Sequence, residues 1–178
     1  MMLPIVVPRT KFFDESTNRF ITVKEQKLTL EHSLVSISKW ESKWEKAFLK
    51  RGPETAEETL DYIRCMTITQ NVAPITYYAI TEENINEILE YIDKPMTASH
   101  VLMPESKSNE VVTSELIYYW MISFGIPFEC QKWHLNRLLS LIKVCNAKSG
   151  GNNFSKDEIL KMNHKLNEQR KRKYHTRG

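Results

Sequence analysis

This chain of 178 residues contains few glycines, few cysteines and no long hydrophobic segment. Its five glycines are too few for the many tight turns of a β-sandwich or barrel, and the abundance of Leu, Lys, Glu and Ile favours helices. The three cysteines, Cys65, Cys130 and Cys145, are widely spaced. We therefore expect no disulfide framework and a reducing compartment.

Apolar residues are never continuous enough to predict a membrane-spanning helix. Such a helix needs about 18 to 20 consecutive apolar residues, and the apolar N-terminus is interrupted by Pro4 and Pro8. The same stretch is too short for the apolar segment of a secretory signal. We therefore expect no association with a membrane and a location in the cytoplasm.

Positive charge is concentrated at the C-terminal end of the chain. Residues 156–178 carry eight Lys or Arg and three acidic residues, whereas residues 1–155 carry 17 basic and 19 acidic residues. Such a basic segment can contact nucleic-acid phosphates, or it can be a solvated helix end where cations are favoured. We disfavour nucleic-acid binding and prefer an acidic protein partner, which includes another copy of the chain. The basic residues concerned are Lys165, Arg170, Lys171, Arg172, Lys173 and Arg177.

The order of predicted elements indicates an α+β fold that is mainly helical. Residues 3–30 contain short runs rich in β-branched residues around the turn sequence DESTN, which predict a small N-terminal β-hairpin or sheet. Helical spacing follows, with a capping box predicted at Thr55 and Glu58 and a cap at Thr81. The stretch 149–154 predicts a linker between a helical body (1–148) and a basic C-terminal helix (155–178).

The second half of the body is predicted to contain a loop and two more helices. Residues 93–109 include Pro95 and Pro104 and predict a long loop. The sequence SELIYYWMISFG, residues 114–125, is apolar nearly all round, which predicts the most buried helix of the fold. Pro127 then begins a helix that extends to residue 146.

The segment from Ser33 to Leu49 raises the main functional question. Five apolar residues recur at three- and four-residue spacing and predict one amphipathic helix; they are Leu34, Ile37, Trp40, Trp44 and Phe48. Tryptophans at helical spacing are most often part of a core, but tryptophan is also enriched at interface hot spots. One ring can serve each purpose, because the two positions differ by about 40° around the helix.

No arrangement of residues predicts catalysis. Cys130 and His134 are four residues apart, a possible spacing for metal ligands, but a zinc site needs about three or four ligands and no second pair follows. A buried thiol beside a hydrogen-bonded or exposed imidazole is the simpler interpretation. The acid pairs Glu57–Glu58 and Glu82–Glu83 lie in predicted first helical turns, where carboxylates are stabilising. We therefore predict no enzyme, no metal and no cofactor.

Four strings of sequence together resemble a family of small proteins from tailed bacteriophages, the tail assembly chaperones. The resemblance extends from about residue 20 to the C-terminus and weakens across 93–109. It rests on LTLEHSLVSISKWESKWEKAFL, LDYIRCMTI, IPFECQKWHLNRLLSLIKVCNAK and MNHKLNEQRKRKYHTRG.

The resemblance implies a protein of the host cytoplasm that transforms no substrate. Chaperones of this kind are thought to coat the tape measure protein, keep it soluble, and present it to tail tube protein subunits. We expect an exposed apolar groove for this client, lined by the five apolar residues of 34–48, together with self-association of the chain.

Two alternatives remain open at this stage. The chain can be a structural minor tail or connector protein retained in the virion, or a nucleic-acid-binding accessory protein that uses its basic tail. Stoichiometric presence in mature particles indicates the first, and binding that falls steeply with salt indicates the second.

Overall fold

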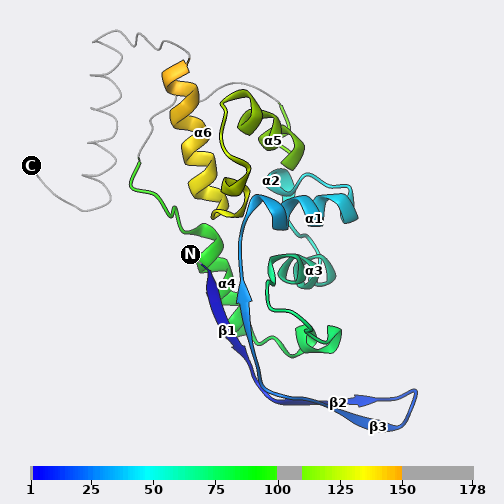
Figure 1. Ribbon diagram of the computed structural model, residues 1–178. Helices are drawn as coiled ribbons and strands as arrows, with labels where there is room; N and C mark the ends of the chain where they lie inside the picture. Colours follow the sequence, from blue (N-terminus) through cyan, green and yellow to red (C-terminus); the bar gives the residue numbers. More distant parts are fainter. Residues whose placement is uncertain (1, 100–109, 150–178) are drawn as a thin grey trace, which may run out of the picture.

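The computed structural model describes residues 2–99 and 110–149. The fold is α+β and mainly helical, as predicted, with two antiparallel strand pairs preceding a group of helices (Figure 1). In chain order the elements are β1 (Leu3–Val7), β2 (Thr10–Asp14), β3 (Arg19–Val23), β4 (Gln26–Leu30), α1 (Leu34–Trp44), α2 (Phe48–Arg51), α3 (Ala56–Met66), the 3₁₀ helix η1 (Pro74–Ala79), α4 (Glu82–Asp93), α5 (Ser114–Ser123), the 3₁₀ helix η2 (Phe128–Lys132) and α6 (Leu135–Ser149).

The N-terminal region forms two strand pairs that follow one another. Strand β1 pairs with β4, and β2 pairs with β3 to form a hairpin. The predicted turn closes this hairpin: the Asp14 carboxylate accepts hydrogen bonds from Ser16 and Thr17, and Asn18 takes a left-handed conformation with φ of 50°. The sequence did not reveal β2, nor that residues 19–30 divide into two strands.

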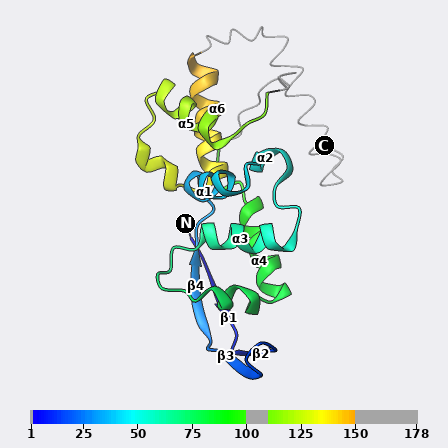
Figure 2. The same ribbon diagram turned by 90° about the vertical axis from the view of Figure 1, so that its right-hand side faces the viewer.

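The two strand pairs differ in how they meet the rest of the molecule. The β1–β4 pair buries alternate residues, among them Val7 and Leu28, because side chains of a strand alternate between its faces. The chain after α3 covers the other edge of β4, where Thr29 bonds to Thr69 and Ile68. The β2–β3 hairpin instead extends away from the helices, at the end of the molecule opposite α5 and α6 (Figures 1 and 2).

Helix α1 lies at the centre of the helical group, between α3 on one side and α5 and α6 on the other (Figures 1 and 2). It ends earlier than predicted, because Glu45 is left-handed with φ of 52°. Phe48 therefore belongs to the short helix α2 rather than to α1. The predicted cap at Gly52 is confirmed: its φ is 66° and its N–H bonds to the Phe48 carbonyl.

The remaining helices follow the predicted order. The capping box at Thr55 and the cap at Thr81 both form, and α4 lies against β1. The helix predicted from Pro127 is divided into η2 and α6 at His134. Helix α6 includes Ser149, the first residue assigned to the linker, and the rest of the linker, the basic C-terminal segment and residues 100–109 lie outside the described residues.

The core joins both strand pairs and the helices. Its fully buried large side chains are Ile5, Leu28, Leu30, Leu34, Ile37, Trp40, Ile63, Met66, Ile117, Met121, Leu135 and Leu138. Within residues 2–99 and 110–149, no helix is both long and apolar enough to cross a lipid bilayer.

Candidate partner-binding site

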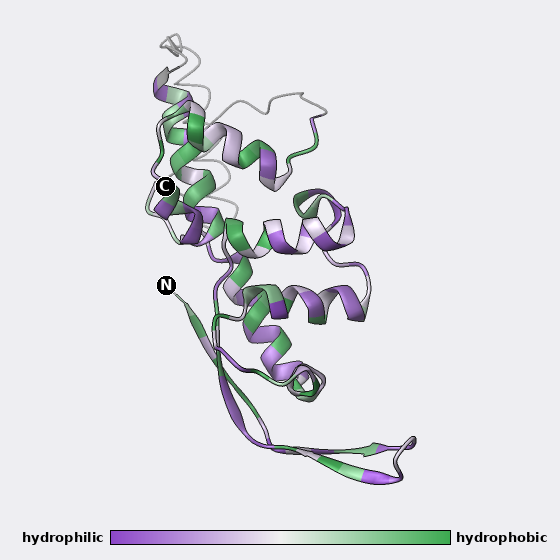
Figure 3. Cartoon of the chain, turned by 45° about the vertical axis from the view of Figure 1, so that its right-hand side comes forward, coloured by the Kyte–Doolittle hydropathy of each residue, from purple (hydrophilic) through white to green (hydrophobic). Residues whose placement is uncertain are grey.

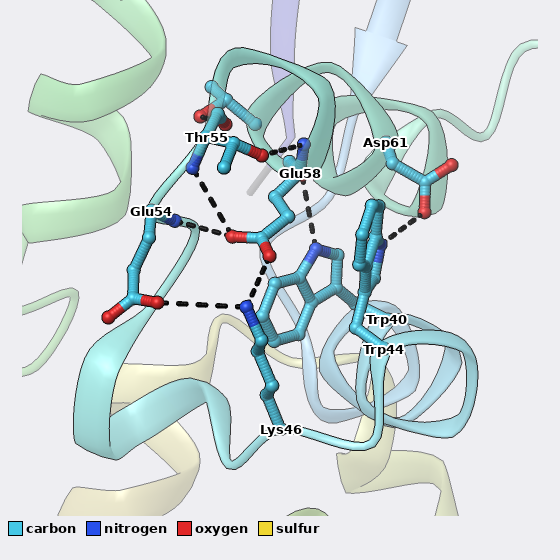
Figure 4. Close-up of polar contacts among 8 residues, drawn as sticks. Trp40, Trp44, Lys46, Glu54, Thr55, Glu58 and Asp61 are labelled. Carbon is cyan, nitrogen blue, oxygen red and sulfur yellow. Dashed lines mark hydrogen bonds and ion pairs between the residues drawn. The ribbon is translucent and has the colours of Figure 1, made fainter.

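The two tryptophans of α1 are held against α3 by hydrogen bonds from their indole nitrogens (Figure 4). Trp40 has no exposed surface, and its Nε1–H donates to the backbone carbonyl of Glu58 at 3.1 Å. Trp44 is half-buried, and its Nε1–H donates to the Asp61 carboxylate at 3.0 Å. Trp40 therefore belongs to the core, whereas Trp44 keeps one part of its ring at the surface.

Glu58 organises the polar contacts at the start of α3. Its carboxylate accepts hydrogen bonds from the backbone N–H groups of Glu54 and Thr55, while its own N–H donates to the Thr55 hydroxyl. The Lys46 ammonium donates to the same carboxylate (Figure 4). This hydrogen bond lowers the pKa of the Glu58 carboxyl and raises the pKa of Lys46. The contacts of Glu58 are those of a helix cap, as predicted.

Glu41 fixes the positions of two helices that follow α1. This side chain is buried, and its Oε1 accepts a hydrogen bond from the Phe48 N–H at 2.8 Å. Its Oε2 accepts one from the Ser114 N–H at 2.7 Å. These N–H groups belong to the first residues of α2 and α5, so a single carboxylate caps both helices.

A cluster of buried histidines and tyrosines lies where β4 leads into α1. The His32 and His134 rings have centroids 5.0 Å apart, and Nδ1 of His32 lies 2.6 Å from the Tyr62 hydroxyl. Burial and the neighbouring His134 lower the pKa of His32 to about 3. Burial also lowers the pKa of His134, whose Nε2 donates to the Tyr91 carbonyl. Both imidazoles are therefore neutral at pH 7 and serve as hydrogen-bonding core residues.

The predicted groove on α1 is not open in this structure. Leu34, Ile37 and Trp40 have no exposed surface, so the prediction that they line a client-binding groove is wrong: they pack against the strands and helices around α1. Trp44 and Phe48 are half-buried. For these two residues a contact with a partner stays a prediction.

Three well-exposed apolar residues of the helical group lie instead on α5 and η2, while Tyr78 of η1 and Leu89 of α4 are exposed elsewhere. Tyr119 and Ile122, one helical turn apart, are 63% and 64% exposed, and Phe128 is 53% exposed. Tyr118 of α5 is half-buried and faces η2: its ring centroid lies 6.4 Å from that of Phe128, and its hydroxyl donates to Gln131. We call Tyr118, Tyr119, Ile122 and Phe128 the α5–η2 patch.

The prediction that α5 is the most buried helix of the fold is wrong for an identifiable reason. A helix that is apolar all round predicts complete burial, but α5 buries only one face against α1, through Ile117 and Met121. Its opposite face carries Tyr119 and Ile122 into solvent. A helix that is apolar on two faces but packs against the core on only one leaves the other apolar face exposed. This pattern in the sequence could have indicated a surface for a partner.

Cys130 and His134, whose spacing alone would suit metal ligands, have structural contacts. Cys130 is buried, and burial raises the pKa of its thiol. Both ring nitrogens of His134 are engaged, Nε2 with Tyr91 and Nδ1 with the Asn136 N–H. Among the described residues, no group of three or more His, Cys, Asp or Glu side chains lies close enough to hold a metal ion. The basic residues from Lys165 to Arg177 lie outside the described ranges.

Comparison of the chain with known protein families, with curated proteins and with solved structures finds no match.

Proposed function

We propose that this chain is a bacteriophage tail assembly chaperone that holds apolar segments of the tape measure protein on the α5–η2 patch. In this role it keeps the client soluble in the host cytoplasm and releases it to tail tube protein subunits. The resemblance of four sequence strings to that family supports the proposal. The observation that carries it is the exposure of Tyr119 and Ile122 on α5 and of Phe128 on η2.

The composition of the α5–η2 patch suits a binding site of low affinity. Burying one such side chain contributes about 1.5–3 kcal/mol, and association costs several kcal/mol before any net affinity appears. Three exposed apolar side chains therefore support weak binding of one copy. Many copies along a very long client would together keep it covered, and each could still be displaced.

The surroundings of the patch favour an amphipathic helix as the bound segment. Glu115 lies one turn before Tyr119, and Glu129 follows Phe128; both acids are exposed. An amphipathic helix presents apolar residues at three- and four-residue spacing between polar ones. Its apolar residues would contact the α5–η2 patch, and its basic residues would lie near the two glutamates.

Co-expression with the tape measure protein of the same phage tests this assignment. We expect the double variant Tyr119→Ser/Ile122→Asn to lose the ability to keep the client soluble, because it removes the exposed apolar surface of α5 without touching the core. The matched control is Tyr78→Ser/Leu89→Asn, which changes side chains 61% and 51% exposed on η1 and α4. Full activity of the first variant, or equal loss in both, contradicts the assignment to α5.

A further inference from the structure

The β2–β3 hairpin contains several hydrophobic residues (Figure 3), and apolar side chains are exposed on both of its faces. Phe13 and Phe20 are opposite each other in the strand register and are 51% and 70% exposed, with ring centroids 5.2 Å apart. Phe12 and Ile21 are opposite each other on the other face, and Ile21 is 39% exposed. A two-stranded hairpin is only marginally stable in isolation. An arm of this composition gains stability when it becomes part of a larger sheet.

The free edge of this hairpin is β2. Among the described residues, β2 pairs with β3 alone, and β3 lies against η1 where the hairpin leaves the body. Unpaired backbone groups on such an edge can pair with another strand. The chain after α3 bonds to β4 and covers the edge of that strand. Within the part of the chain that the structure describes, no strand pairs with the outer edge of β2.

The charges along β2 indicate which strand fits this edge. The end nearest the body is basic, with Arg9 directly before the strand and Lys11 within it, and the turn end is acidic, with Asp14 at the end of the strand and Glu15 in the turn. The Asp14 carboxylate is engaged in the turn, but Arg9 and Glu15 are exposed. When the same strand of a second copy pairs with β2 in the antiparallel direction, the basic end of each strand faces the acidic end of the other. Opposite charges facing each other across strands are stabilising, and like charges are destabilising.

We propose that two copies of this chain pair through β2, antiparallel and two-fold symmetric, and form a four-stranded sheet in the order β3–β2–β2–β3. In the register centred on Phe12, Arg9 of each copy faces Glu15 of the other, and Lys11 faces Phe13. The two Phe12 rings meet at the axis on one face of the sheet, flanked by Ile21 from each copy. A register centred on Lys11 would place two lysines opposite each other and is disfavoured.

This pairing is independent of the proposed function, because it uses the opposite end of the molecule from the α5–η2 patch (Figure 1). A dimer formed in this way would carry two such patches. If the chain is a chaperone, pairing would increase its avidity for a long client.

A charge swap in the full chain tests the pairing and its register, with dimerisation measured by analytical ultracentrifugation over a range of concentrations. Arg9→Glu alone places two acidic side chains opposite each other at both ends of the interface, and Glu15→Arg alone places two basic ones. Each should raise the dimer dissociation constant about tenfold. The double variant Arg9→Glu/Glu15→Arg should restore the original value, as should an equimolar mixture of the two single variants.

Cysteine cross-linking tests which strand lies at the axis. Opposed residues of neighbouring antiparallel strands have Cα atoms about 4.5–5.5 Å apart, within the range of a disulfide. Phe12→Cys should give a covalent dimer on mild oxidation, whereas Phe20→Cys, which lies on β3 and is separated from its copy by two strands, should behave like the unsubstituted chain. A monomer at every concentration, single variants that dimerise normally, or cross-linking of Phe20→Cys in place of Phe12→Cys would each overturn the proposal.

Discussion

Removal of the Glu41 carboxylate should destabilise the fold more than the loss of an ordinary helix cap. The two oxygens accept hydrogen bonds from the first N–H groups of α2 and α5, at Phe48 and Ser114. A hydrogen bond to a charged group contributes about 1.5–3 kcal/mol, and a buried N–H left without its partner adds a desolvation cost. We therefore expect Glu41→Ala to lower the free energy of unfolding by about 3–5 kcal/mol.

Urea denaturation at pH 7, followed by far-ultraviolet circular dichroism, measures this loss. Glu41→Gln keeps one carbonyl oxygen as an acceptor, so its loss should be about half that of Glu41→Ala. Glu90→Ala, which removes an exposed glutamate from α4, is the control and should change stability by less than about 0.5 kcal/mol. If Glu41→Ala costs less than about 1 kcal/mol, the double-cap explanation is refuted.

Three further predictions concern polar groups of the helical region. Lowering the pH from about 7 to about 5 should reduce the free energy of unfolding by about 2 kcal/mol. The reason is that His32 has a folded-state pKa of about 3 and an ordinary value of 6.5, so it takes up a proton on unfolding. Urea titrations at both pH values check this, and the variant His32→Asn should show a weaker dependence of stability on pH. Trp40→Phe should cost about 2–3 kcal/mol through lost burial and a lost hydrogen bond, whereas Trp44→Phe should cost about 1 kcal/mol or less in the same urea assay. Thr55→Ala should cost about 1 kcal/mol, and thermal denaturation should show a correspondingly lower midpoint.

Features that depend on a few neighbouring residues could be predicted from the sequence. The capping box at Thr55, the cap at Thr81 and the C-terminal cap at Gly52 all arise from side chains or backbone conformations within one helical turn. The mainly helical α+β class follows from the same local signals. These signals do not require knowledge of the tertiary structure.

Features that depend on distant contacts could not be predicted. At the break after α1, Glu45 is left-handed and the buried Glu41 carboxylate bonds to the N–H groups of Phe48 and of the distant Ser114, and helical spacing across the break gives no sign of these contacts. His134 was considered beside Cys130 because they are close in sequence, but its ring lies next to His32, which is far away along the chain. An all-apolar helix such as α5 does not reveal which of its faces the body covers.

Hydrogen–deuterium exchange of the full chain, alone and bound to the tape measure protein, tests the central claim most directly. We expect slower amide exchange over residues 115–128 in the complex, because the client would cover the outer face of α5 and η2. Unchanged exchange over these residues, with protection at another surface in the same complex, would contradict the assignment of client binding to the α5–η2 patch.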